Sequence, residues 1–359
     1  MSNIILPGLI DPHVHLRDPG QTNKEDFYTG TSAALAGGFT KIIDMPNNKS
    51  PITTAKKLDE KVKIAREKIV CDVGFYFGSI GDNAEEFPKV INKVIGLKLY
   101  LSQTTGNFLV DQKKLEPIFT NWTSALHSAK ELKEKPILVH AEDKMLSIVI
   151  QLAKKLGNKV HVCHISTAYD LKQIIKAKEN GLNITCGVTP HHLFLTESDV
   201  RKLGPFGMMK PPLRSKKDQD FLWKNLKFID VVESDHAPHT IEEKRGEVPP
   251  FGVPGLETTL PLLLTVVSEK RLTIDDVVRL CHTNTAKILN IKIDKQTYIE
   301  VDLNSQFSIL NSQLHTKCGW TPFDGWKVKG KVEKVWIRGK KVFEDGKILA
   351  KKGSGKLVS

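Results

Sequence analysis

Two histidines stand two residues apart near the start of the chain, in the stretch Asp-Pro-His-Val-His-Leu-Arg at 11–17, directly after the apolar run 4–10. Residues i and i+2 of a strand point to the same face, so the imidazoles of His13 and His15 can enter one cavity and bind one cation. Arg17 shares their parity and would place a fixed guanidinium, suited to a carboxylate, beside them. A single His-X-His pair can also be two incidental core or surface histidines, so the rest of the chain must decide.

Lys98 lies between Leu97 and Leu99 in a second apolar run. A buried ammonium ion there would be costly. One interpretation is a lysine at a strand edge that extends its ammonium to solvent. In a cavity lined with histidines another is available, because a neutral lysine amine can add carbon dioxide. The resulting carbamate resembles a carboxylate whose two oxygens can bridge two metal ions.

Further side chains of the ligand type stand at the ends of other apolar runs, namely His140, His164 and Asp235. Imidazoles combined with carboxylates suit zinc. Two zinc ions that share a hydroxide would provide a nucleophile near neutral pH for attack on an amide-like carbonyl. Asp235 is of the right type to bind one metal and to carry a proton to the leaving nitrogen. The candidate ligands are therefore His13, His15, Lys98, His140, His164 and Asp235.

These residues must be positioned by a scaffold of alternating strands and helices. Eight β-like runs lie before residue 290, and stretches of helical period separate them, for example at 55–68, 143–156 and 168–180. Alternating β and α units imply a parallel sheet, and eight of them predict an α/β fold, the (β/α)8 TIM-like barrel. A barrel of this kind carries its active site at the carboxyl ends of the strands.

The sequence changes character near residue 291. Short alternating runs follow, such as 307–310 and 335–338, with a hairpin-like end at 340–346. We therefore expect a barrel at 1–290 and a small β appendage with its tail at 291–359, packed with the N-terminal residues. The last residues, 351–359, are expected to be a frayed tail.

The composition argues against several classes of protein. The 359 residues are 40% hydrophobic and 26% charged, with a formal net charge of +12. Five widely spaced cysteines without a CxxC pair favour reduced thiols in a cytoplasmic protein. We expect neither a signal peptide nor a membrane span. Basic residues are interleaved with acidic ones and no nucleic-acid-binding motif is present, which favours a solvated surface over nucleic-acid binding.

The motifs together resemble the amidohydrolase superfamily, and within it the dihydroorotases. The stretches that carry the resemblance span nearly the whole chain and lie at 11–20, 44–47, 96–100, 139–142, 162–164, 189–194, 234–239 (Ser-Asp-His-Ala-Pro-His) and 252–258 (Gly-Val-Pro-Gly-Leu-Glu-Thr). The short N-terminus and the lysine ligand are most similar to the dihydroorotase domain of the multifunctional animal pyrimidine enzyme and its stand-alone relatives.

The resemblance implies a role for each candidate residue. One zinc ion would be held by His13, His15, Lys98 and Asp235, and the other by Lys98, His140 and His164, with carbamylated Lys98 and a hydroxide between them. Asp235 would also be the general acid/base. The substrate carboxylate would be bound by Arg17, Asn47 and His239, while Lys210 takes the place of an arginine. Thr104 and Thr105 would belong to a substrate loop at 102–107.

One departure from the family pattern concerns a further metal site. Gly187 stands where the animal domain carries a glutamate implicated in an extra metal site. Without that carboxylate, Cys163 is expected to be an inert buried thiol. His191 and His192 are expected to support the site through hydrogen bonds, and His236 to be structural.

The implied activity is the reversible cyclisation of N-carbamoyl-L-aspartate to L-dihydroorotate in pyrimidine biosynthesis. The implied organisation is a homodimer that associates with aspartate transcarbamoylase. A rival is an allantoinase- or hydantoinase-type cyclic amidohydrolase, against which the carboxylate-binding set of Arg17, Asn47 and His239 speaks. A second rival is a non-catalytic homologue that acts as a partner of aspartate transcarbamoylase. Such homologues commonly lack ligands, whereas all are present here.

Overall fold

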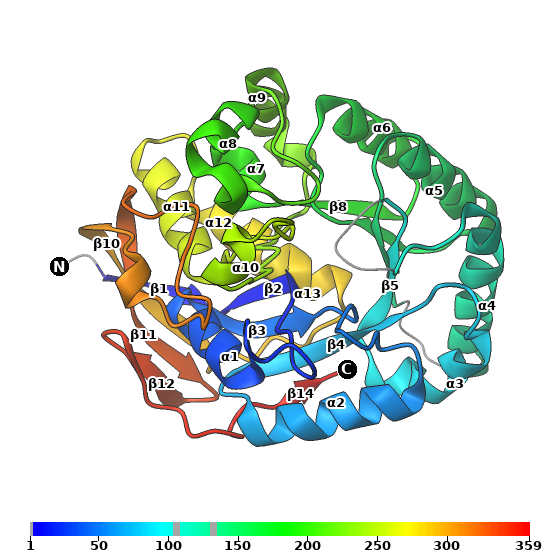
Figure 1. Ribbon diagram of the computed structural model, residues 1–359, viewed down its shortest axis with the longest axis horizontal. Helices are drawn as coiled ribbons and strands as arrows, with labels where there is room; N and C mark the ends of the chain where they lie inside the picture. The colour runs from blue at the N-terminus through cyan, green and yellow to red at the C-terminus, as the bar shows by residue number, and fades with distance from the viewer. Residues whose placement is uncertain (1–2, 103–107, 130–134) are drawn as a thin grey trace.

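Eight parallel strands form a closed barrel, as predicted (Figure 1). The computed structural model describes residues 3–102, 108–129 and 135–359. Val14 pairs in parallel with His236, and this bridge closes the ring between its first and last strands. The strands in ring order are β2 (Leu9–Val14), β3 (Phe39–Asp44), β4 (Asp72–Gly78), β5 (Gly96–Tyr100), β6 (Ile137–His140), β7 (Val160–Val162), β8 (Ile184–Val188) and β9 (Val231–Val232).

Helices surround this barrel on the outside (Figure 1). The helix predicted at 55–68 has the expected bounds. It begins there because Thr54 caps its first turn by accepting a hydrogen bond from the Lys57 amide. The α-helices are α1 (Phe27–Ala36), α2 (Ala55–Lys68), α3 (Phe87–Val90), α4 (Leu115–Ser128), α5 (Asp143–Leu156), α6 (Ala168–Glu179), α7 (Pro190–Phe194), α8 (Glu197–Leu203), α9 (Lys216–Lys224), α10 (Ile241–Arg245), α11 (Leu256–Ser268), α12 (Ile274–Val278) and α13 (Asn284–Ile288). A π-helical turn, Arg279–Thr283, joins the last two helices. In the described part of the chain, no helix is long and apolar enough to cross a membrane.

A second, antiparallel sheet lies beside the barrel and is built mainly from the end of the chain. Its strand order is β1-β10-β11-β12-β13. The strands are β1 (Asn3–Pro7), β10 (Tyr298–Ser308), β11 (Lys327–Ile337), β12 (Lys340–Glu344) and β13 (Lys347–Ile348). The single N-terminal strand that the apolar run predicts is therefore two strands, one in each sheet.

Pro7 and Gly8 explain this division. Proline lacks the amide proton that a central strand would need. A Cβ on Gly8 would lie 2.4 Å from Thr40 Oγ1, so only glycine lets the chain pass this close to β3. The run 4–10 thus changes sheets at Gly8, and β2 alone carries the histidines into the barrel.

The C-terminal tail is not frayed, and this prediction was wrong. Strand β14 (Leu357–Val358) pairs in parallel with β4, opposite Val73 and Gly74 (Figure 1). The Val73 amide donates to the Lys356 carbonyl at 2.9 Å, and the Lys356 amide donates to Asp72 at 2.9 Å. β4 pairs with β5 only from Tyr76 onward, so its first half offers backbone groups that the tail satisfies.

Candidate active site

Two imidazoles and one carboxylate meet at the carboxyl end of the barrel. His15 Nε2 lies 3.1 Å from Asp235 Oδ1, and His13 Nε2 lies 3.3 Å from the same oxygen. His13 is near the end of β2, His15 follows it, and Asp235 follows β9. Four ligands arranged tetrahedrally around zinc at about 2.0–2.1 Å stand about 3.3 Å apart. Each imidazole is therefore as far from the Asp235 carboxylate as two neighbouring ligands of one zinc ion are from each other.

The proton positions strengthen this fit. His15 Nδ1 lies 2.7 Å from Asn47 Oδ1, an oxygen that can only accept, so the proton of His15 is on Nδ1. His13 Nδ1 likewise faces a carboxylate oxygen of Glu233 at 3.5 Å. Each Nε2 atom then carries a lone pair that is directed at the Asp235 carboxylate. Such a group of acceptors fits a bound cation.

The second half of the site lies across the barrel, on β5, β6 and the loop after β7. His140 Nδ1 is 3.0 Å from His164 Nε2. Lys98 is completely buried, which excludes a lysine that extends to solvent, and its Nζ donates to Cys163 Sγ at 3.0 Å. The buried Nδ1 of His164 makes no hydrogen bond within the described residues. These groups adjoin the first set, because His13, His164 and Asp235 each place one ligand atom within 4.8 Å of the others.

Burial sets the protonation of these groups. It lowers the pKa of His13, and it lowers the pKa of His15 and His164 well below the usual value, with neighbouring cationic groups adding to the shift. The imidazoles are therefore neutral, the form that binds metal. Burial also raises the pKa of Asp235 to about 6, so this carboxylate is ionised at neutral pH.

Glu233 is a buried carboxylate that the sequence analysis overlooked. Its carboxylate accepts from the His164 amide, and its second oxygen lies 3.6 Å from His161 Nε2. Although burial alone would raise the pKa of Glu233, His13 and His161 lower it. A Cβ on Gly187 would lie 2.6 Å from Glu233 Cδ, so this side chain fills the space above that glycine. The signal was available: Glu233 precedes Asp235 by two residues and shares its parity.

Cys163 is buried, as expected, and burial raises the pKa of its thiol to about 12. The expectation rested on the lack of a nearby carboxylate, and that reason was wrong. Glu233, which follows β9, supplies one, since Cys163, Glu233 and His13 also place ligand atoms within 4.8 Å of one another.

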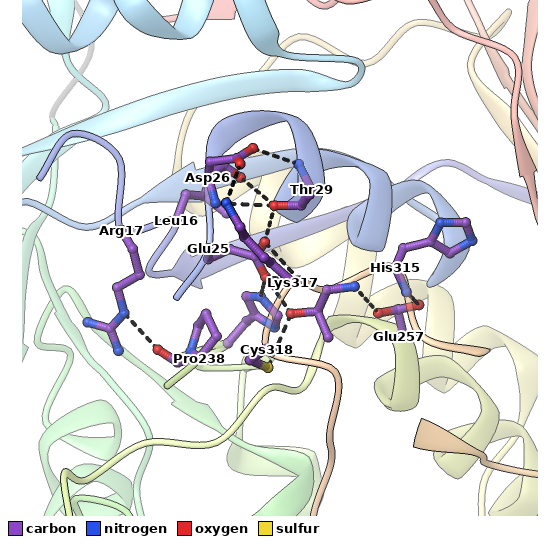
Figure 2. Close-up of polar contacts among 12 residues, drawn as sticks. Leu16, Arg17, Glu25, Asp26, Thr29, Pro238, Glu257, His315, Lys317 and Cys318 are labelled. Carbon is purple, nitrogen blue, oxygen red and sulfur yellow. Dashed lines mark hydrogen bonds and ion pairs between the residues drawn. The ribbon is translucent and has the colours of Figure 1, made fainter. Parts of the chain in front are cut away.

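Arg17 and His239 stand together at the other side of the cleft. Arg17 Nε donates to the Pro238 carbonyl at 3.1 Å (Figure 2), and its Nη2 lies 3.2 Å from His239 Nε2. Burial and the adjacent cations Arg17 and Lys24 lower the pKa of His239, so its ring is neutral. Strand parity does not place Arg17, because β2 ends at Val14 and Arg17 has a φ of 63°. A left-handed turn brings its side chain into the cleft.

The sequence analysis missed Lys24, a second buried cation in this group. Lys24 Nζ lies 3.2 Å from His239 Nδ1 and 2.9 Å from a carboxylate oxygen of Glu243. A lysine can only donate, so His239 Nδ1 accepts and the proton is on Nε2. That proton points to the Phe251 carbonyl, 3.0 Å away, so Arg17 Nη2, 3.2 Å from Nε2, is a second donor beside it and not its hydrogen-bond partner. Lys24 thus fixes the tautomer of His239.

The remaining predicted residues are distributed as follows. One cleft, with an empty volume of about 380 Å³, contains His13, His15, Arg17, Asn47, Tyr100, His140, His164, Lys210, Asp235, Ala237, Phe251 and Gly252. Lys210 Nζ lies 4.9 Å from the centre of the Phe251 ring. Thr104 and Thr105 lie outside the described residues. Lys98 and His239 do not line the cleft. His239 contacts the lining residue Arg17, and Lys98 donates to Cys163, which precedes the lining residue His164.

His192 and His236 are buried and hydrogen-bonded to the scaffold, whereas the buried Nε2 of His191 makes no hydrogen bond within the described residues. His192 Nδ1 contacts Thr189 Oγ1 at 2.7 Å, and its Nε2 donates to the Pro211 carbonyl at 3.1 Å. The Gly255 amide donates to Nδ1 of His236, and Nε2 of that ring lies 3.3 Å from Glu25. Neither ring points a free lone pair at the candidate ligands.

Comparison with known proteins identifies the family. The model of the amidohydrolase family matches residues 4–342. A dihydroorotase from Pyrococcus horikoshii is 38% identical, over 99% of this chain and 84% of the relative. The chain belongs to the amidohydrolase family, in its dihydroorotase branch. The multifunctional protein CAD from Squalus acanthias is 44% identical over 99% of the chain, which spans 16% of the length of that relative.

Solved structures agree with this fold. The L-hydantoinase from Arthrobacter aurescens superimposes with a TM-score of 0.93 at 26% identity, covering 100% of this chain and 89% of that one. An inactive dihydroorotase-like domain of a CAD-like multifunctional protein from Chaetomium thermophilum gives a TM-score of 0.84 at 27% identity, covering both chains completely. The fold is therefore shared by active and inactive relatives, and the residues of the site must decide the activity.

Proposed function

We propose that the chain is a metal-dependent dihydroorotase that interconverts N-carbamoyl-L-aspartate and L-dihydroorotate. The observation that carries the proposal is that His13 and His15 each approach the Asp235 carboxylate within 3.3 Å, in one cleft with Arg17. The Pyrococcus relative supports the choice of substrate.

Two zinc ions would be held by the six strand-end residues. His13, His15 and Asp235 would bind one ion, and His140 and His164 the other, with Lys98 between them as a carbamate. Zinc in these positions would polarise the amide carbonyl and activate water. The position of Lys98 supports a carbamate, because this side chain is completely buried beside Cys163, between the two sets of candidate ligands.

The side chains of the chain would then bind the substrate and move one proton. Arg17, Asn47 and the Nε2–H of His239 would donate to the substrate carboxylate, and the Oδ1 of Asn47 would also hold His15 in its metal-binding tautomer. Asp235 would give a proton to the leaving ring nitrogen in hydrolysis and remove it in ring closure. Ring closure consumes one carboxylate, takes up one proton and releases one water, so acid favours cyclisation.

A hydantoinase-type activity is the second candidate, because the L-hydantoinase shares the fold closely. The test is turnover of L-dihydroorotate, allantoin and a hydantoin by the zinc-loaded protein. We expect activity on dihydroorotate, because Arg17 offers its carboxylate a partner that neutral rings do not use. Activity on the neutral rings alone would overturn the proposal.

The inactive Chaetomium domain makes a non-catalytic homologue the third candidate. All six proposed ligands are present here, which speaks against it. Protein without bound metal and without activity on any of these rings would favour it.

We further propose a cytoplasmic homodimer that associates with aspartate transcarbamoylase. All five cysteines are free and buried, which is consistent with a reducing compartment. The Squalus relative joins the equivalent segment to a much longer multifunctional chain. Light scattering of the protein alone and mixed with aspartate transcarbamoylase would test both associations, and a monomer unaffected by the mixture would refute them.

A further inference from the structure

Glu25 is a completely buried carboxylate outside the cleft, and it joins three segments that are far apart in the sequence (Figure 2). It belongs to the loop between β2 and α1, which also carries Arg17. Its Oε2 lies 3.3 Å from Nε2 of His236, in the loop that carries Asp235 and His239. It also accepts hydrogen bonds from the Thr316 hydroxyl and from the Lys317 amide, the latter at 3.2 Å.

The partners of Glu25 present hydrogen-bond donors to it. The Gly255 amide donates to Nδ1 of His236 at 3.2 Å, so the proton of that ring is on Nε2 and points to Glu25. The hydroxyls of Thr29 and Thr316 and the amide of Lys317 complete the set. A carboxylate is the side chain that can accept from all of them, since an amide offers only one acceptor oxygen.

The segment 315–320 extends this connection to the substrate end of the cleft. Trp320 Nε1 donates to the His239 carbonyl at 2.7 Å. Half-buried Glu257 holds the start of the segment, accepting from the amides of His315 and Thr316 at 2.8 and 3.0 Å (Figure 2). Lys317 Nζ binds Asp26, the residue that caps α1, at 3.2 Å. The loops that carry Arg17 and His239 are therefore both fastened to one C-terminal segment.

We propose that Glu25 is a positioning residue for substrate binding. Through the segment 315–320 it fixes the position of the Arg17 loop relative to the His239 loop. It touches neither substrate nor metal in this account. It acts because a carboxylate ligand needs donors at a fixed separation, here the 3.2 Å between Arg17 Nη2 and His239 Nε2. The inference rests on the proposed function, since it assumes that these two residues bind the carboxylate of dihydroorotate.

Glu25→Gln tests this role. The amide would direct an N–H group at the donors of His236, Thr316 or Lys317. The Arg17 loop and the His239 loop would then no longer be held at a fixed position relative to each other. We expect the Kd and KM for L-dihydroorotate to rise by about 10-fold or more, with kcat changed by less than about threefold and the zinc content unchanged. Thr316→Val removes one donor while keeping the shape of the side chain, and it should shift the same constants in the same direction by a smaller factor.

Glu300→Gln is the matched control. Glu300 also accepts two hydrogen bonds in the C-terminal sheet, from Lys334 at 2.8 Å and Trp336 at 3.1 Å, and neither bond involves the 315–320 segment. Its Kd and KM should equal those of the wild type. An unchanged Kd in Glu25→Gln would overturn the inference, as would loss of zinc with unchanged KM. If that variant does not fold, an unchanged Kd in Thr316→Val overturns it.

The failure of the proposed function gives a different result. Wild-type protein that binds L-dihydroorotate in calorimetry but does not turn it over would refute the enzyme activity and leave the ratio of Kd values as the test of Glu25. Wild-type protein that does not bind this ligand would overturn both.

Discussion

At the scale of single residues, spacing predicted the site better than it predicted the neighbours that support it. His13 and His15 were predicted from their parity and Asp235 from its place at a strand end. The structure brings each imidazole within 3.3 Å of the Asp235 carboxylate. Lys24 could not be predicted in the same way, because a loop places it against His239, 215 residues later in the chain. Long-range contacts of this kind leave no periodic signal in the sequence.

Lys98 should be essential for metal binding. Lys98→Ala removes the only side chain in this account that bridges the two halves of the site, so we expect loss of most bound zinc and of activity. Lys98→Arg, which keeps a cation but cannot form a carbamate, should fail in the same way. Metal analysis and dihydroorotate turnover measure both effects, and added short-chain carboxylates should restore part of the Lys98→Ala activity. Full activity in either variant would rule out the carbamate.

Metal affinity should depend on pH through Asp235. Burial raises the pKa of this carboxyl to about 6 in the metal-free chain, whereas the pKa values of His13, His15 and His164 are lowered. As the pH falls through about 6, a proton therefore competes with zinc, and affinity should drop about tenfold per pH unit. Competition titrations between pH 5 and pH 8 measure this. A drop that begins above pH 7 would indicate protonation of imidazoles instead.

At the scale of elements, hydrophobic periodicity located the barrel strands and the long helices, but not the exchanges between sheets. The run 4–10 looks like one strand because Pro7 and Gly8 interrupt it for only two residues. The tail at 351–359 is short, rich in lysine and glycine, and has no pattern of its own. It becomes a strand because β4 leaves part of its edge unpaired by β5, a property of the folded barrel alone.

Strand β14 should stabilise the barrel without taking part in its chemistry. Deleting residues 355–359 removes the bonds that link Lys356 to Val73 and Asp72. We expect the free energy of unfolding to fall by about 1–3 kcal/mol, with kcat and KM of the folded protein unchanged. Denaturant unfolding followed by circular dichroism measures the loss, and deletion of Ser359 alone is the control. Equal stability of the two truncated chains would show that β14 contributes nothing.

At the scale of the whole molecule, the two ends of the chain join different sheets. β1 pairs with β10 in the antiparallel sheet, while β14 pairs with β4 of the barrel (Figure 1). The same C-terminal region supplies the segment 315–320 that contacts Glu25 and His239. The appendage is therefore part of the support of the cleft as well as a separate sheet, which a boundary drawn at residue 291 from the sequence could not convey.

The net charge of +12 should act on the two substrates unequally. N-carbamoyl-L-aspartate carries two carboxylates and dihydroorotate one, so the positive field attracts the former more strongly. Raising the ionic strength from about 0.01 M to about 0.15 M screens this field. We expect kcat/KM to fall more for cyclisation than for ring opening, measured at one pH with a neutral osmolyte as control. An equal change in both directions would show that the overall charge has no such role.

The zinc content of the fully active protein tests the central claim most directly. The account predicts two zinc ions per chain, loss of activity on L-dihydroorotate when a chelator removes them, and recovery when zinc and bicarbonate are returned. Full activity on L-dihydroorotate with one zinc ion per chain, or with none, would contradict the two-metal site formed by His13, His15, Lys98, His140, His164 and Asp235.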